Sequence, residues 1–388
     1  MRSSLLSIGL VVVSGALLRF WNLDHAHVAA VETRIVMAVA QLIHSGSYRP
    51  PSLAQPTLPI YLQTSVAMIH FIWGAAAGAW RSVTGFGPEQ IIGWGRGFSA
   101  LIGTAVVFIV FQVGSRWGAR HALLAAGLLA VTPLHVSHSR QMADGSALTF
   151  FSALTLLLSL IAVERQHRRS FIIAAAAAGL AAACHFAGTL LVLLPLVAVW
   201  MTPDDKDHRL PRAALVLVTA VIAFIAANPL AVGDLPAFLN GVADAAAPVG
   251  AQVAGGVDRL DILVALVGTL RWPGVILSVA GLILGIVRAV TGPGHTRWTL
   301  LVSFPVVQLA VALWRRATPD TALLPLMPAV TVLAAIAVIS GVSLLRRFDF
   351  PRSVRTALIA ALTVAAVLPP AIVSIELVRL EGKEQNVR

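Results

Sequence analysis

Residues 171–200 read FIIAAAAAGLAAACHFAGTLLVLLPLVAVW, an apolar run of 30 residues with no Asp, Glu, Lys or Arg. As one straight helix the run would be about 45 Å long, whereas the hydrocarbon core of a bilayer is about 30 Å thick. Two short helices that break near Cys184 and His185 fit this thickness better. The run therefore predicts a chain that crosses the membrane twice at this point.

The whole chain has the composition of a helical membrane protein. Of its 388 residues, 58% are hydrophobic and 12% are charged, and the mean hydropathy is +0.86. Soluble domains carry about 25% charged residues. Only helices and closed barrels satisfy their backbone hydrogen bonds in lipid, and the apolar runs are longer than barrel strands. We therefore predict an all-α integral membrane protein.

The net charge of +11 comes mainly from short arginine clusters between apolar runs. This pattern is typical of cytoplasmic loops in multi-pass proteins and argues against a nucleic-acid partner. The single cysteine, Cys184, excludes an intrachain disulfide. The basic start and the apolar run at 4–20 resemble a signal peptide, but no small-x-small cleavage site follows. We expect this run to be retained as the first span.

The arginine-rich segments fix the threading when all of them are placed in the cytoplasm. The chain is then a single transmembrane domain over 1–388 in the plasma (inner) membrane, with a cytoplasmic N-terminus. About eleven spans follow from this placement. They are 4–20, 94–114, 121–137, 146–163, 171–184, 187–201, 213–230, 268–289, 298–314, 322–342 and 356–376.

Two long loops, 21–93 and 231–267, face the outside in this threading. Within the first loop, residues 58–80 are apolar enough to span, but a span there would invert every later loop. We therefore predict an interfacial or re-entrant helix on the outer side. Its aromatic residues suit an interface. No internal repeat is present, which disfavours a lipid flippase or transporter.

Polar residues in the outer loops or at membrane depth are candidates for chemistry. Asp24, His25 and His27, with Glu32 following, could supply a carboxylate base, a substrate contact or metal ligands. They could equally form a solvated loop in which Glu32 sits near a helix N-terminus. The spacing of residues in a loop is a weak metal signal, so we assign no metal ligands.

A second group lies between the third and fourth predicted spans, at His135, His138, Arg140 and Asp144. Asp144 could simply cap the helix that follows it. Alternatively, Arg140 and the helix N-terminus could hold a phosphate. Both interpretations fit the sequence.

Four further residues are candidates because of their depth or their side of the membrane. His185 at the helix break could line a cavity or be a satisfied structural histidine. Arg96, Arg315 and Arg316 place positive charge on the outer side. They could bind a lipid-linked phosphate, or extend toward phospholipid headgroups without further function.

The order of several short motifs resembles the GT-C superfamily of membrane glycosyltransferases, especially its protein O-mannosyltransferase-like branch, which uses polyprenyl-phosphate sugars. The resemblance covers roughly residues 20–330. The stretches that carry it are 18–23 (LRFWNL), 45–50 (SGSYRP), 56–62 (PTLPIYL), 96–104 (RGFSALIGT), Ser139-Arg140 with Asp144 and 150–151, 228–229 (NP) with Asp234 and Phe238, and 324–328 (LPLMP).

In that family an Asp-Glu pair in the first outer loop supplies the base for an acceptor hydroxyl. Spacing back from Gly46 places the pair at Val31 and Glu32, so a valine stands in the aspartate position. His185 stands where the family has a lysine. Thr321-Ala322 replaces an Arg-Tyr pair before the Leu-Pro-x-x-Pro helix.

The resemblance implies an inverting glycosyltransferase that moves a sugar from a polyprenyl-phosphate donor to an acceptor hydroxyl at the outer membrane face. Glu32 or Asp144 would be the base. The residues expected to contact substrate are Arg96, Arg140, His185, Arg315 and Arg316. A divalent metal is an open question. The departures also leave room for a catalytically degenerate subunit of a larger assembly with membrane-protein partners.

Overall fold

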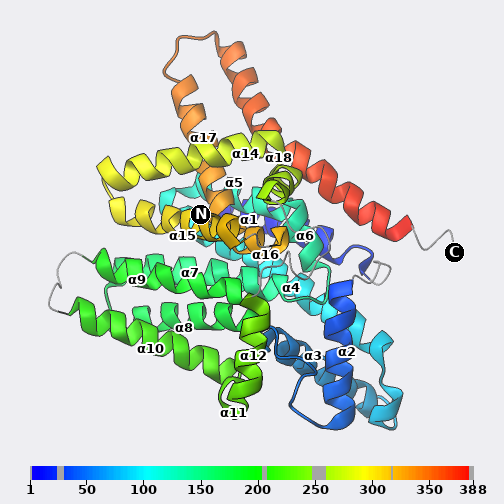
Figure 1. The fold of residues 1–388 in the computed structure, drawn as a ribbon. Helices are drawn as coiled ribbons and strands as arrows, with labels where there is room; N and C mark the ends of the chain where they lie inside the picture. The colour runs from blue at the N-terminus through cyan, green and yellow to red at the C-terminus, as the bar shows by residue number, and fades with distance from the viewer. Residues whose placement is uncertain (1, 24–29, 203–207, 247–258, 316–317, 384–388) are drawn as a thin grey trace.

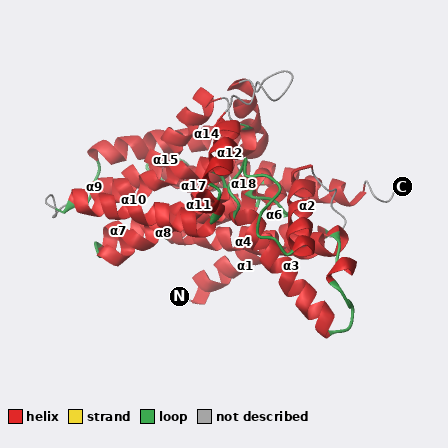
Figure 2. Ribbon diagram, turned by 60° about the horizontal axis from the view of Figure 1, so that its bottom comes forward, coloured by secondary structure: helices red, strands yellow, loops and turns green. Residues whose placement is uncertain are grey.

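The computed structural model describes residues 2–23, 30–202, 208–246, 259–315 and 318–383. These residues form helices joined by turns and loops, with no strand among them (Figures 1 and 2). The all-α class predicted from the apolar runs is confirmed. The helices are α1 (Arg2–Phe20), α2 (Ala30–Ser45), α3 (Leu58–Ala76), α4 (Pro88–Gly114), α5 (Ala119–Ala130), α6 (Pro133–Ser139), α7 (Gly145–Arg165), α8 (Arg168–Cys184), η4 (Phe186–Val192), α9 (Leu193–Trp200), α10 (Arg209–Ala227), α11 (Leu230–Gly233), α12 (Leu235–Ala246), α14 (Arg259–Thr291), α15 (His295–Arg315), α16 (Pro319–Leu323), α17 (Met327–Leu345) and α18 (Arg352–Lys383).

Seven helices in the described part of the chain are long and apolar enough to cross a membrane. The number rises to eight when α5 and α6, which are bent by 62° at their junction, count as one span. The segments Leu6–Phe20 and Phe186–Trp200 are apolar but shorter. The total of about eleven spans stays a prediction, as does the interfacial placement of α3.

The break predicted in the run 171–200 lies where the sequence places it. Helix α8 ends at Cys184, and His185 adopts an extended conformation with φ of −161°. The His185 Nδ1 atom accepts a hydrogen bond from the backbone N–H of Ala187 at 3.0 Å. The chain then continues into η4 and α9, which pack back against α8. The single histidine in the apolar run thus caps the segment that returns.

Helices α7, α8 and α10 lie side by side and form one half of the bundle (Figure 1). The alanine-rich sequence of α8 allows its backbone to approach its neighbours closely. A Cβ atom added at Gly179 of α8 would collide with the carbonyl oxygen of Ala220 in α10. Gly179 therefore sets the distance between these two helices.

The two ends of these three helices carry different residues. Helix α7 begins after Asp144, α8 ends before His185, and α10 ends before Asn228. The opposite ends of these helices carry the arginines of segments 164–169 and 209–212. Asp144, His185 and Asn228 therefore share one end of the bundle, away from these arginines.

The two predicted outer loops meet at that end. Asn228 Oδ1 accepts hydrogen bonds from the N–H and the hydroxyl of Thr57, at 2.5 and 2.9 Å. Arg49 pairs with Asp234 at 2.7 Å. These contacts hold the segment 49–57, which leads into α3, against the start of the second loop.

Replacement of Gly179 by alanine should force α8 and α10 apart. We expect a loss of about 1–3 kcal/mol in the free energy of unfolding, because overpacked interfaces cost this much. The measurement is thermal unfolding in detergent. Gly127 in α5 is the matched control, because a Cβ there meets no atom within 4 Å. Equal stability of G179A and G127A would contradict the close approach of the two helices.

Candidate functional site

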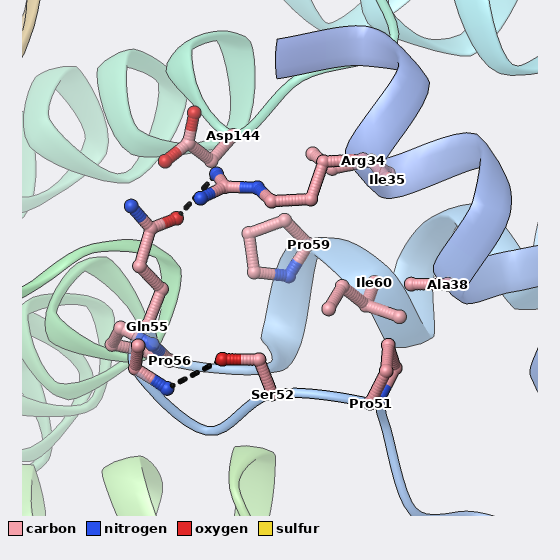
Figure 3. Close-up of a pocket in the computed structure, with 11 residues that line it drawn as sticks. Arg34, Ile35, Ala38, Pro51, Ser52, Gln55, Pro56, Pro59, Ile60 and Asp144 are labelled. Atoms are coloured by element: carbon pink, nitrogen blue, oxygen red, sulfur yellow. Dashed lines mark hydrogen bonds between the residues drawn. The ribbon is translucent and has the colours of Figure 1, made fainter. Parts of the chain in front are cut away.

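An open pocket lies where α2, the segment 51–56, the start of α3 and the start of α7 meet. Its empty space is about 480 Å³, which includes open solvent at its mouth. Most of its wall is apolar or proline-rich. The polar lining is Arg34, Ser52, Gln55 and Asp144 (Figure 3).

Asp144 is the acidic residue of this pocket. It occupies the N-cap position of α7, yet its side chain makes no capping hydrogen bond. Its residue is half-buried, and among the described residues no hydrogen bond or ion pair within 4 Å engages its carboxylate. A carboxylate of this kind is available to accept a proton or to contact a ligand.

Arg34 supplies positive charge beside Asp144. Its guanidinium donates to Gln55 Oε1 at 2.7 Å and lies between the Asp144 and Gln55 side chains in Figure 3. His185 lies close enough to interact electrostatically with both Asp144 and Arg34. One anionic and one cationic group therefore share the pocket, with an imidazole nearby.

Glu32 has a different environment. Its side chain is fully buried and forms a two-point ion pair with Arg96, at 2.7 Å to Nε and 2.8 Å to Nη2. The N–H of Met142 donates to the same carboxylate at 2.9 Å. Arg96 also donates to the carbonyl oxygen of Leu23 at 3.1 Å. Both Glu32 oxygens are thus occupied, which favours a positioning role over that of a base.

The Glu32 carboxylate is linked to the pocket by a hydrogen bond from the backbone N–H of Met142. Met142 lies two residues before Asp144, so the hydrogen bond from its N–H fixes the turn that carries Asp144. The ion pair joins α2 to α4 and anchors the start of α7 to both. Glu32 and Asp144, which the sequence offers as alternative bases, are therefore physically linked with separate environments.

Arg140 contacts the end of α1. It is buried and donates to the carbonyl oxygens of Leu18, Arg19 and Trp21 at the end of α1. These contacts satisfy carbonyls that a helix C-terminus leaves unpaired. Arg140 is therefore engaged with the end of α1.

His138 packs over the first turn of α7 and pairs with Asp320 of α16, with 3.3 Å between Nε2 and Oδ2. The hydrogen bond from the His138 ring lowers the pKa of the Asp320 carboxyl below its usual value. This pair connects α16, just before α17, to the helix end that carries Asp144.

Several predicted residues fall outside this description. Asp24, His25, His27 and Arg316 lie outside the described residues, as does the side chain of Arg315. In the described part of the chain, no group of three His, Cys, Asp or Glu side chains could hold a metal ion. The roles assigned to these residues stay predictions.

Arg34 and Gln55 were missed by the sequence analysis. Helical spacing could have indicated Arg34. The pocket-lining residues Arg34, Ile35 and Ala38 share one face of α2. Position 31 lies one turn before Arg34 on this face. The valine that replaces the family aspartate is therefore near the pocket, with a cation one turn away.

Residues 91–232 match the family model described as dolichyl-phosphate-mannose-protein mannosyltransferase. No curated protein sequence matches the chain. Among solved structures, the apo oligosaccharyltransferase of Archaeoglobus fulgidus is similar with a TM-score of 0.67 and 15% identity, over 97% of this chain and 56% of that one. ArnT from Cupriavidus metallidurans bound to undecaprenyl phosphate is similar with a TM-score of 0.63 and 17% identity, over 97% and 75%.

These similarities confirm the resemblance inferred from the sequence motifs, and the chain has the fold of the GT-C membrane glycosyltransferases. The chain spans only 56% of the length of the archaeal oligosaccharyltransferase.

Breaking the buried ion pair should destabilise the protein more than altering the pocket carboxylate does. We expect Glu32→Ala to cost about 3–5 kcal/mol of unfolding free energy, because it leaves Arg96 buried without its partner. Asp144→Ala should change the same quantity by less than about 1 kcal/mol. Thermal unfolding in detergent measures both. Similar losses in the two variants would contradict the distinction between the two carboxylates.

Proposed function

We propose that the protein is a membrane glycosyltransferase that moves a sugar from a polyprenyl-phosphate donor to an acceptor hydroxyl. The observation that supports this most is the carboxylate of Asp144, which makes no hydrogen bond or ion pair with the described residues and lies in an open pocket beside Arg34. The GT-C fold and the match to the mannosyltransferase family model support the same reaction class.

In this proposal Asp144 is the base. An alcohol is a weak nucleophile, and a positioned carboxylate that takes its proton speeds the attack by about 10²–10⁴-fold. The acceptor oxygen forms a bond to the anomeric carbon while the bond from that carbon to the phosphate oxygen breaks. Attack from the side opposite the phosphate inverts the configuration of the sugar.

Arg34 has the complementary task. The electron pair of the broken bond leaves with the polyprenyl phosphate, so negative charge grows on the phosphate during the reaction. A guanidinium can bind two phosphate oxygens at once and stabilise this charge. His185, whose Nδ1 atom accepts the Ala187 N–H, lies near enough to orient the acceptor.

A lipid-linked donor suits the position of the pocket. The pocket lies at the end of α7, α8 and α10 opposite the arginines of segments 164–169 and 209–212. Arginine-rich ends favour the cytoplasmic side, which supports a position of the pocket at the outer face. The similarity to ArnT, solved with undecaprenyl phosphate, favours a polyprenyl carrier. Glu32, Arg96 and Arg140 act in this proposal by positioning the pocket.

A second candidate function is that of a non-catalytic subunit in a larger membrane assembly. It is favoured by Val31, which removes a carboxylate from the pocket side of α2, and by the use of Glu32 in packing. A stoichiometric partner that co-purifies in mild detergent, together with a lack of transfer by the isolated chain, would support this candidate over the enzyme.

The Asp144→Asn variant tests the enzymatic proposal. We expect it to lower the rate of sugar transfer from undecaprenyl-phosphate mannose to an alcohol acceptor by at least about 100-fold, because the base is lost. Radiolabelled sugar in the product gives the rate. Asp349→Asn is the matched control, since Asp349 is exposed in the segment between α17 and α18. Wild-type transfer by D144N would sink the assignment of Asp144 as the base.

A further inference from the structure

Gln55 is the side chain that contacts the cation of the pocket. Its Oε1 atom accepts a hydrogen bond from Arg34 Nη2 at 2.7 Å (Figure 3). A guanidinium can only donate, so the amide oxygen must face it, which fixes the orientation of the amide. Among the described residues, the Arg34 side chain makes no second hydrogen bond and no ion pair. Gln55 therefore fixes the position of the Arg34 guanidinium.

The backbone that carries Gln55 is held on both sides of this residue. Two residues before it, the carbonyl oxygen of Leu53 approaches Gly241 of α12 so closely that a Cβ atom on this glycine would collide with it. Two residues after it, Thr57 donates two hydrogen bonds to Asn228 Oδ1. The amide of Gln55 thus extends from a segment that contacts with the second loop keep in place.

The Arg34 guanidinium and the Asp144 carboxylate do not pair, although both line the pocket. Opposite charges attract more strongly where water is partly excluded. Nevertheless, no ion pair within 4 Å joins these two described residues. The guanidinium bonds to Gln55 instead (Figure 3). The hydrogen bond to Gln55 therefore competes with an ion pair that would occupy both charged groups of the pocket.

The neutrality of Gln55 determines what this contact does to the charge of Arg34. A carboxylate in the same place would neutralise the guanidinium and repel a phosphate. An amide oxygen accepts the hydrogen bond without a net charge, so the positive charge of Arg34 is retained. A guanidinium carries several N–H donors, and one bond to Gln55 leaves others for the oxygens of a phosphate.

We propose that Gln55 is a positioning residue that holds the Arg34 guanidinium apart from Asp144, so that Arg34 can bind the phosphate of a lipid-linked donor. This inference rests on the proposed glycosyltransferase function and adds a residue that keeps its two charged groups separate. Without the bond to Gln55, Arg34 pairs with Asp144. A phosphate must then break this ion pair before it can bind.

The test measures the affinity of the purified protein in nanodiscs for undecaprenyl phosphate, which requires no sugar transfer. Gln55→Met keeps a similar volume but removes the acceptor, and should lower the affinity about tenfold because Arg34 then pairs with Asp144. In a chain that also carries Asp144→Asn, no carboxylate remains to form this pair. The same glutamine substitution should then change the affinity by less than about twofold. Gln112→Met, near the other end of α4, is the matched control and should bind as the wild type does.

Gln55→Glu keeps the test decisive if Q55M fails to fold, because its carboxylate can still accept the hydrogen bond from Arg34. The added negative charge should lower the affinity by at least about tenfold while the thermal stability stays that of the wild type. Wild-type affinity in Q55E would indicate a merely structural role and would overturn the proposal. So would a loss in Q55M that has the same size with and without Asp144→Asn, because Gln55 would then not act by separating the two charges.

Lipid binding and sugar transfer together separate this inference from the proposed reaction. Sugar transfer by the wild type, with wild-type affinity in Q55M, would leave the reaction standing and refute the role of Gln55. A loss in Q55M that disappears with Asp144→Asn, in a protein that transfers no sugar, would support the role of Gln55 and refute the reaction. A wild type that does not bind undecaprenyl phosphate would refute the inference.

Discussion

The ion pair between Glu32 and Arg96 is the contact on which the arrangement of the site depends. Both side chains are almost completely removed from solvent, and burial of a charge is costly unless it is fully paired. Two hydrogen bonds join Arg96 to Glu32. In addition, Glu32 accepts a hydrogen bond from the N–H of Met142, and Arg96 donates one to the carbonyl oxygen of Leu23. These contacts hold α2, α4 and the segment just before α7 in fixed positions relative to one another.

The ion pair distinguishes Glu32 from Asp144, two acidic residues that the sequence offers as equal candidates for the base. Glu32 is the first-loop carboxylate that remains after the family aspartate is replaced by Val31, and so it is the obvious substitute base. Both oxygens of Glu32 already accept hydrogen bonds from Arg96 or Met142. Asp144 stands at a helix start without a capping hydrogen bond, beside a cation. A helix N-terminus favours negative charge, which suits a carboxylate at this position.

The large features of the molecule were predictable because they follow from hydropathy and length. The apolar run around Cys184 and His185 was too long for one span, and the structure has its break there. The arginine clusters placed Glu32 and Asp144 on the same side, and the structure links these residues through Met142. The pairing of Glu32 with Arg96 was not predictable, because 64 residues separate them and spacing does not determine which side chains meet. Arg34 was missed because nothing in the sequence distinguishes it from an ordinary charge on an amphipathic helix.

The central claim is that a lipid-linked sugar reacts in the pocket between Arg34 and Asp144. The most direct measurement is a cryo-EM structure of the protein with a phosphonate analogue of undecaprenyl-phosphate mannose, in which the bond to the sugar cannot be cleaved. The account predicts the phosphonate within hydrogen-bonding distance of Arg34 and the anomeric carbon facing the space beside Asp144. A ligand bound at the arginine-rich end of the bundle, or an Asp144 carboxylate paired away from the ligand, would contradict it.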